Sequence, residues 1–198
     1  MALGMDRSGR RPVRSCVSCG RVLRASARFC DACGWPTMPT AAAEHKQVTV
    51  LFGDVVGSMK LAAALDPERL QELMHEIFNR SAVVVQRYGG TVDKFTGDGL
   101  MALFGAPVAL EDHGLRACIA ALKIQEATAE LAVEVRRRDN IELKMRVGLN
   151  SGEVIAGAIG GGPGRYTAVG HPVGMAQRME AAARPGAVLC TESTARRV

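Results

Sequence analysis

The order of elements along the chain predicts an α+β fold, with a ferredoxin-like core behind a small N-terminal unit. Three observations support this prediction. A strand-like apolar run precedes a helical pattern, two short strand-like runs form a hairpin, and a long helical stretch leads to further strands. This βαββαβ order is typical of one sheet with helices on one face. Paired cysteines precede the pattern and mark the small unit.

The first strand and helix have clear local signals. Residues Gln47–Val56 form a β-rich apolar run that one carboxylate, Asp54, interrupts. Such a run is typical of a strand buried on both faces. Asp66 and Pro67 then start a helix, because aspartate caps the first amides and proline fits the first turn. Apolar residues recur at helical spacing until Gly89-Gly90 ends the helix.

The hairpin is predicted from two strand-like runs, Thr91–Phe95 and Leu100–Phe104. Asp98 and Gly99 in the connection are a strong turn signal, so the hairpin tip carries a second carboxylate. The periodicity of the remaining chain predicts five further regions. The five are a helix at Glu111–Arg138, strands at Glu142–Asn150 and Val154–Ile159, a helix near Val173–Ala183 and a strand at Ala187–Cys190.

Length and composition fit one ordinary domain plus an appendage. The chain has 198 residues, of which 47% are hydrophobic, and its apolar runs are far shorter than the roughly 18 residues that span a bilayer. The basic N-terminus is not followed by the apolar segment of a signal peptide. We therefore expect a cytoplasmic protein without a membrane partner.

The net charge of +5 is concentrated at the N-terminus. Residues 1–40 hold seven arginines and two aspartates, whereas acidic and basic residues balance in the rest of the chain. Scattered arginines with one nearby aromatic pair are a weak signal for nucleic acid. A nucleic-acid partner is therefore not expected, and a nucleic-acid-binding regulator is a weaker hypothesis for the function.

Four of the six cysteines form two closely spaced pairs, Cys16 with Cys19 and Cys30 with Cys33. Each pair can place two thiolates on a tight turn, and four thiolates satisfy a tetrahedral zinc ion without an open position. The spacing therefore predicts a structural zinc ribbon. Two disulfides or an iron–sulfur site are the alternatives, and a reducing compartment disfavours the disulfides.

These signals divide the chain into four parts. They are a basic tail at residues 1–13, the zinc ribbon at 14–35, a linker at 36–45 that is rich in proline and small residues, and a globular domain at 46–198. Cys118 and Cys190 lie in apolar patterns of this domain and are interpreted as core residues rather than ligands.

Asp54 and Asp98 are the candidate catalytic pair. A lone aspartate before a turn usually caps or ends a strand. Here both carboxylates belong to apolar, central strands, an arrangement similar to the palm of polymerases, in which paired carboxylates hold two magnesium ions. Hard oxygen ligands select Mg²⁺ or Mn²⁺ over softer metals. The sequence therefore predicts two such ions at Asp54 and Asp98.

Four segments resemble, in order, the characteristic blocks of class III adenylate and guanylate cyclases. They are VTVLFGDVVGSMKLAAALDPE, GGTVDKFTGDGLMALFGAP, MRVGLNSGEVIAG and YTAVGHPVGMAQRMEAA. The resemblance extends from residue 47 to residue 198. It implies the fold of a class III nucleotidyl cyclase domain, and the conversion of a purine nucleoside triphosphate to a 3′,5′-cyclic monophosphate and pyrophosphate.

The resemblance also implies which residues hold the metals and the triphosphate. Asp54 and Asp98 would bind both metal ions, with help from the backbone carbonyl of Val55. The turn Val56-Gly57-Ser58 would wrap the phosphates, since backbone amides there can donate to phosphate oxygens.

Four more residues are implied in base and charge recognition. Lys94 and Thr167 match the base-reading positions, and a cationic donor with a hydroxyl suits N1 and N6 of adenine, so ATP is the expected substrate. Arg178 matches an arginine that stabilises the α-phosphate during transfer, and Arg146 one that contacts the terminal phosphates. In the family, the metal aspartates come from one subunit and the base-reading residues and Arg178 counterpart from the other. A head-to-tail homodimer, or a heterodimer with another cyclase subunit, is therefore expected.

The sequence departs from the family pattern at two places. Gly174 stands where the family has an asparagine that orients the ribose, a loss worth on the order of 10²–10³ in rate. The chain also ends at Val198, before the final strands of family members, so we expect a sheet that lacks them. The expected function is an adenylate cyclase of low or conditional activity. A catalytically degenerate nucleotide-binding and dimerisation module is the alternative.

Overall fold

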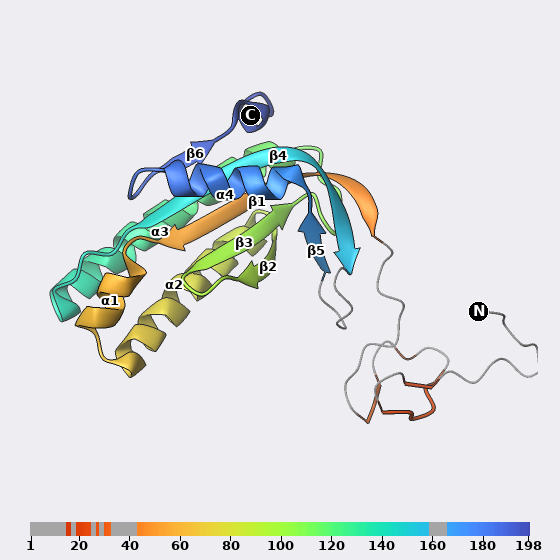
Figure 1. Cartoon of the computed structure of the whole chain (residues 1–198), viewed down its shortest axis with the longest axis horizontal. Coiled ribbons are helices and arrows are strands. Elements are labelled where there is room, and N and C mark those ends of the chain that lie inside the picture. The colour runs from red at the N-terminus through yellow and green to blue at the C-terminus, as the bar shows by residue number, and fades with distance from the viewer. Residues whose placement is uncertain (1–14, 17–18, 25–26, 28–29, 33–42, 159–165) are drawn as a thin grey trace, which may run out of the picture.

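A six-stranded sheet forms the centre of the fold, in the order β2-β3-β1-β4-β5, with β6 paired to β4 (Figure 1). Strand β6 runs parallel to β4, and the other pairs are antiparallel. The order β2-β3-β1-β4 is that of a ferredoxin-like core, so the predicted fold class is confirmed. The computed structural model describes residues 15–16, 19–24, 27, 30–32, 43–158 and 166–198. The strands are β1 (Glu44–Val55), β2 (Thr91–Phe95), β3 (Gly99–Phe104), β4 (Met145–Ala158), β5 (Tyr166–Val169) and β6 (Val188–Cys190).

Helices α2 and α3 cover one face of the sheet and build most of the core. Leu51, Leu73 and Ile124, which come from β1, α2 and α3, are fully buried in one apolar cluster. Helix α2 begins as predicted, because the Asp66 carboxylate accepts a hydrogen bond from the Arg69 amide. No helix in the described ranges is both long and apolar enough to cross a membrane. The helices are α1 (Ser58–Ala64), α2 (Pro67–Arg87), α3 (His113–Asp139), α4 (His171–Ala182) and α5 (Glu192–Ala195).

Helix α4 lies on the opposite face of the sheet from α3, which corrects the expectation that helices cover a single face (Figure 1). The central strands are apolar on both faces: Val50 and Met101 belong to a second buried cluster, which Ala176 of α4 helps to cover. Gly148 of β4 lets the helix cross at very close range. A Cβ atom at Gly148 would lie 2.0 Å from the backbone nitrogen of Glu180.

Strand β4 is a single element, whereas the sequence predicted two strands with a break near Ser151-Gly152. The break is absent because this segment pairs continuously with β1, from Val55 opposite Met145 to Glu44 opposite Ala156. Partner hydrogen bonds therefore override the local turn signal. The short helices α1 and α5 and strand β5 were not predicted.

Candidate active site

Asp54 and Asp98 lie side by side where β1 ends and the β2–β3 connection turns. Asp54 pairs with Gly99 in the antiparallel register, and the Val55 amide donates to the backbone oxygen of Asp98 over 3.0 Å. Gly99 permits this close approach, because a Cβ atom there would lie 2.7 Å from the Gly53 carbonyl oxygen and 3.4 Å from Asp54 Oδ1. The backbone therefore brings the two predicted metal-binding carboxylates to one place.

Both carboxylates also accept hydrogen bonds from neighbouring side chains. Arg146 Nη2 on β4 donates to Asp54 Oδ2 over 2.9 Å, and Ser58 Oγ at the start of α1 donates to Asp98 Oδ2 over 2.5 Å. The Asp54 side chain keeps 21% of its surface exposed, so a ligand can reach it from solvent. Burial raises the pKa of Asp54; the Arg146 hydrogen bond lowers it, and the negative charge of Asp98 raises it again.

Glu180 on α4 adds a third carboxylate, which sequence reasoning did not select. Its Oε1 lies 3.1 Å from Arg146 Nε, but the two groups are not aligned for a hydrogen bond, and neither atom has another hydrogen-bond partner among the described residues. Burial raises the pKa of Glu180, and the charges of Asp54 and Asp98 raise it further against the opposing effect of Arg146. Arg146 is therefore held between two carboxylates from β1 and α4.

The turn Val56-Gly57-Ser58 stands next to this group. The Val56 amide donates to the Lys144 carbonyl oxygen over 2.9 Å, so it is not available to a phosphate. Gly57 is the N-cap of α1, in the left-handed conformation, and no side chain caps this helix. Because the first amides of a helix have no partner within it, the amides of Gly57 and Ser58, rather than that of Val56, are the candidate donors for a phosphate.

The base-reading candidates Lys94 and Thr167 form a separate group around Asp93. Thr167 Oγ1 on β5 donates to Asp93 Oδ2 over 2.7 Å, and Lys94 Nζ lies 3.6 Å from the same oxygen. The Asp93 side chain is only 4% exposed, whereas that of Lys94 is 39% exposed. Lys94 and Thr167 therefore meet at one carboxylate, Asp93, which sequence reasoning did not select.

Arg178 stands apart from both groups in this chain. It is exposed on α4, and its Nη1 lies 3.9 Å from the sulfur of Met175. The buried face of α4 carries Ala176 and Glu180 instead. Gly174, one helical turn before Arg178, is also exposed, and a Cβ atom there would meet no atom within 4 Å.

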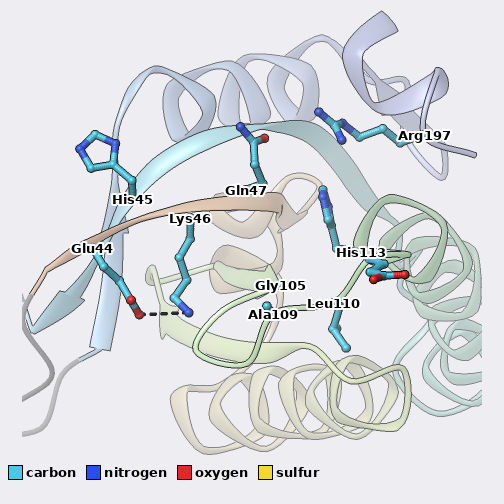
Figure 2. A pocket seen from close by; sticks show the side chains of 10 residues that line it. Glu44, His45, Lys46, Gln47, Gly105, Ala109, Leu110, His113 and Arg197 are labelled. Atoms are coloured by element: carbon cyan, nitrogen blue, oxygen red, sulfur yellow. Dashed lines mark ion pairs between the residues drawn. The ribbon is translucent and has the colours of Figure 1, made fainter.

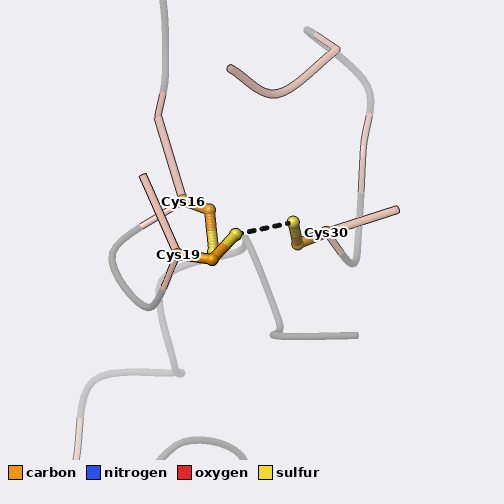
Figure 3. Close-up of side chains that lie close together, drawn as sticks. All are labelled: Cys16, Cys19 and Cys30. Atoms are coloured by element: carbon orange, nitrogen blue, oxygen red, sulfur yellow. Dashed lines mark hydrogen bonds between the residues drawn. The ribbon is translucent and has the colours of Figure 1, made fainter. Parts of the chain in front are cut away.

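Three N-terminal cysteines gather into one cluster (Figure 3). The sulfur atoms of Cys16, Cys19 and Cys30 all lie within 4.8 Å of one another, and Cys19 and Cys30 are 3.6 Å apart. Thiolates about 2.3 Å from a tetrahedral zinc ion lie about 3.8 Å from one another, so the cluster fits such an ion. The fourth predicted ligand, Cys33, lies outside the described residues.

An open hollow of about 670 Å³ lies at the other end of β1 (Figure 2). Glu44, Lys46, His113 and Arg197 are among the residues that line it. The lining charges are mixed, and Lys46 is already paired with Glu44 over 3.0 Å. This hollow is separate from the Asp54 and Asp98 group.

Comparison with known proteins agrees with this geometry. Residues 40–198 match the family model described as adenylate and guanylate cyclase catalytic domain. The chain belongs to this family, the class III nucleotidyl cyclases. Enzymes of this class bind a nucleotide, use two divalent metal ions and form dimers.

Curated relatives include cyclases for both purine nucleotides. A membrane guanylyl cyclase of Dictyostelium discoideum is 31% identical over 152 residues, which is 76% of this chain and 10% of the relative. Adenylate cyclase 1 of Rhizobium meliloti is 31% identical over 140 residues, 70% of this chain and 21% of the relative. The chain thus spans only a small part of the length of these relatives.

Similar solved structures include both guanylyl and adenylyl cyclases. The guanylyl cyclase Cya2 has a TM-score of 0.74 and 31% identity, covering 78% of this chain and 79% of its own. The adenylyl cyclase CyaB from P. aeruginosa has a TM-score of 0.75 and 28% identity, covering 79% and 82%. The solved structures that resemble this chain therefore also include cyclases named for either purine nucleotide.

Proposed function

We propose that this chain is the catalytic domain of an adenylate cyclase, which converts ATP to 3′,5′-cyclic AMP and pyrophosphate at a dimer interface. The observation that carries the proposal is the convergence of Asp54 and Asp98, held by the pairing of β1 with β3 and by the Val55 amide. The family match supports cyclase chemistry.

The donor set suits Mg²⁺ or Mn²⁺, because carboxylate oxygens are hard ligands. Asp54 and Asp98 would hold two such ions, with the Val55 carbonyl as an additional ligand. When bound, such ions would supply Lewis-acid activation of the 3′-hydroxyl and would neutralise charge on the triphosphate. Arg146 would compete with such a cation for Asp54, because Arg146 donates a hydrogen bond of 2.9 Å to this carboxylate. Its position beside Glu180 gives the guanidinium a second carboxylate.

The other candidate residues would bind the phosphates and the base. The amides of Gly57 and Ser58 and the released Arg146 guanidinium would hold the phosphates. Lys94 and Thr167 would serve the nucleotide whose metal ions are held by the second subunit of the dimer: Lys94 would donate to N1 of adenine, and the Thr167 oxygen would accept from its N6 amino group. ATP is favoured over GTP because N1 of guanine carries a hydrogen and its C6 carries an oxygen, so both partners would be mismatched.

A head-to-tail dimer would complete each site. Arg178 is exposed on α4, away from the buried face that carries Glu180. It therefore suits the α-phosphate of a nucleotide bound to a second subunit, which is either another copy or a related cyclase chain.

The proposal is tested by measuring cyclic AMP formation from ATP with Mn²⁺, for the wild type, Asp98→Ala, Arg178→Ala and an equal mixture of the two variants. Each variant alone is expected to be inactive. The mixture should regain about a quarter of wild-type activity, because half of the dimers are mixed and each contains one intact site. A wild type that makes no product, or a mixture that stays inactive, contradicts the composite adenylate cyclase site.

A nucleotide-binding and dimerisation module without catalysis is the second candidate. Gly174 favours it, because this position lacks the side chain amide that family enzymes use. This alternative predicts saturable ATP binding with no product. Product formation that Asp54→Ala abolishes would rule it out.

The N-terminal cluster is proposed to be a structural zinc ribbon, with Cys33 as the fourth ligand of Cys16, Cys19 and Cys30. The three sulfur atoms in the structure support this proposal by their spacing. The expected cytoplasmic location is consistent with it, since reducing conditions keep cysteines as thiols available to zinc.

A further inference from the structure

Asp93 occupies an unusual place in β2. The register between β2 and β3 shifts between Val92, which pairs with Ala102, and Lys94, which pairs with Met101, so Asp93 is an extra residue. In a regular strand, Asp93 and Lys94 would point to opposite faces of the sheet. A β-bulge re-aims side chains, and here the Asp93 carboxylate and the Lys94 ammonium lie 3.6 Å apart.

The same carboxylate also fixes a residue from the far edge of the sheet. Strand β5 lies beyond β4 in the strand order, yet Thr167 donates its hydroxyl hydrogen to Asp93 Oδ2 over 2.7 Å. A threonine hydroxyl has one hydrogen and two lone pairs. Because an ionised carboxylate can only accept, the hydrogen of Thr167 is committed to Asp93, and its oxygen presents lone pairs elsewhere.

We infer that Asp93 is a positioning residue for base selection, which makes Thr167 an obligatory hydrogen-bond acceptor and holds the Lys94 ammonium beside it. Thr167 then accepts from the 6-amino group of adenine and rejects the 6-oxo group of guanine, which needs a donor. Asp93 does not touch the base. This inference rests on the proposed adenylate cyclase function and explains how that site distinguishes the two purines.

The burial of Asp93 explains how it can influence the base through Thr167. The Asp93 side chain is 4% exposed, so little water competes for its oxygens, and the hydrogen bond from Thr167 to a charged acceptor is among the strong kinds. Without the carboxylate, the Thr167 hydroxyl can rotate and donate to a 6-oxo group. The predicted loss is in selectivity rather than in catalysis as such.

The test compares kcat/KM for ATP and for GTP, with Mn²⁺, in the wild type, Asp93→Ala and Asp93→Asn. Competition of unlabelled ATP and GTP for a fluorescent nucleotide provides a second readout that needs no turnover. Asp93→Ala is expected to lower the ATP-to-GTP ratio by about tenfold, the value of one hydrogen bond of ordinary strength. Asp93→Asn keeps the side-chain shape and should change the ratio in the same direction. Glu153→Gln removes an exposed carboxylate from β4 that pairs with His45, and should leave the ratio unchanged.

A double-mutant comparison separates positioning from a general structural effect. If Asp93 acts through the hydroxyl, Asp93→Ala in a Thr167→Val background should change the ratio much less than in the wild type. A wild type that prefers ATP, with an unchanged ratio in folded Asp93→Ala and Asp93→Asn, overturns the role of Asp93 and leaves the proposed function standing. A wild type that prefers GTP contradicts the proposed function itself, and the inference fails with it.

Discussion

Replacing Gly174 with asparagine is expected to increase cyclase activity strongly. The substitution restores the side chain amide that the family resemblance implies for orienting the ribose. The site has room for it, because Gly174 is exposed and a Cβ atom there meets no atom within 4 Å. The introduced amide would also lie one helical turn from Arg178, on the side of α4 that faces away from the sheet.

The substitution Gly174→Asn is expected to change the reaction rate far more than the stability of the fold. Asparagine is a slightly better helix former than glycine, so the free energy of unfolding should change by less than about 0.5 kcal/mol. One pre-oriented hydrogen-bond donor is worth on the order of 10²–10³ in kcat. The two expected effects therefore differ by several kcal/mol.

The assay measures the initial rate of cyclic AMP formation with Mn²⁺ and ATP, together with the thermal midpoint of each protein. Gly174→Ala is the matched control, because alanine stabilises the helix by about 1 kcal/mol over glycine but carries no amide. Gly174→Asn should exceed Gly174→Ala by at least tenfold in kcat. Equal rates for these two variants would show that the missing amide does not limit the reaction.

Three further results are expected. Gly148→Ala should lower the free energy of unfolding by about 1–3 kcal/mol, because its Cβ would lie 2.0 Å from the Glu180 backbone nitrogen; a thermal midpoint equal to that of the wild type would contradict the close crossing. Glu180→Gln should stabilise the metal-free protein at neutral pH, with a gain that fades on acidification. Because the pKa of Glu180 is raised in the folded protein, its contribution to the free energy of unfolding is complete at low pH and is lost as pH rises through the folded pKa. A stability gain from Glu180→Gln that does not change with pH in denaturant titrations would contradict this reasoning. Cys19→Ser should reduce the zinc content from about one ion per chain in elemental analysis, whereas Cys190→Ser on β6 should not; equal zinc in both variants would argue against the ribbon.

Local signals in the sequence were sufficient for the core of the fold. Asp66 and Pro67 mark the start of α2, and Asp98 with Gly99 marks the turn between β2 and β3, because each of these residues acts on its own neighbours. The convergence of Asp54 and Asp98 also follows from the sequence, since Asp54 lies near the end of β1, Asp98 directly precedes β3, and these two strands must pair in a ferredoxin-like sheet.

Tertiary contacts determined what the sequence did not predict. Ser151-Gly152 resembles a turn but continues β4, because β1 supplies a partner along the whole strand. Asp93 turns toward Lys94 only because of a bulge, which has no signal in the alternation of β2. Glu180 offered a weak signal: it lies four residues after the buried Ala176, on the same face of α4. A carboxylate on a buried helix face could have been recognised as a candidate.

Direct measurement of Mn²⁺ binding tests most directly whether Asp54 and Asp98 hold the metal ions. Electron paramagnetic resonance can count the ions bound in the presence of a non-cyclisable ATP analogue, for the wild type, Asp54→Asn, Asp98→Asn and the exposed control Glu153→Gln. Two ions per nucleotide are expected in the wild type and control, and at least tenfold weaker Mn²⁺ binding in either aspartate variant. Unchanged Mn²⁺ affinity and stoichiometry in both aspartate variants would show that Asp54 and Asp98 do not hold the metal ions.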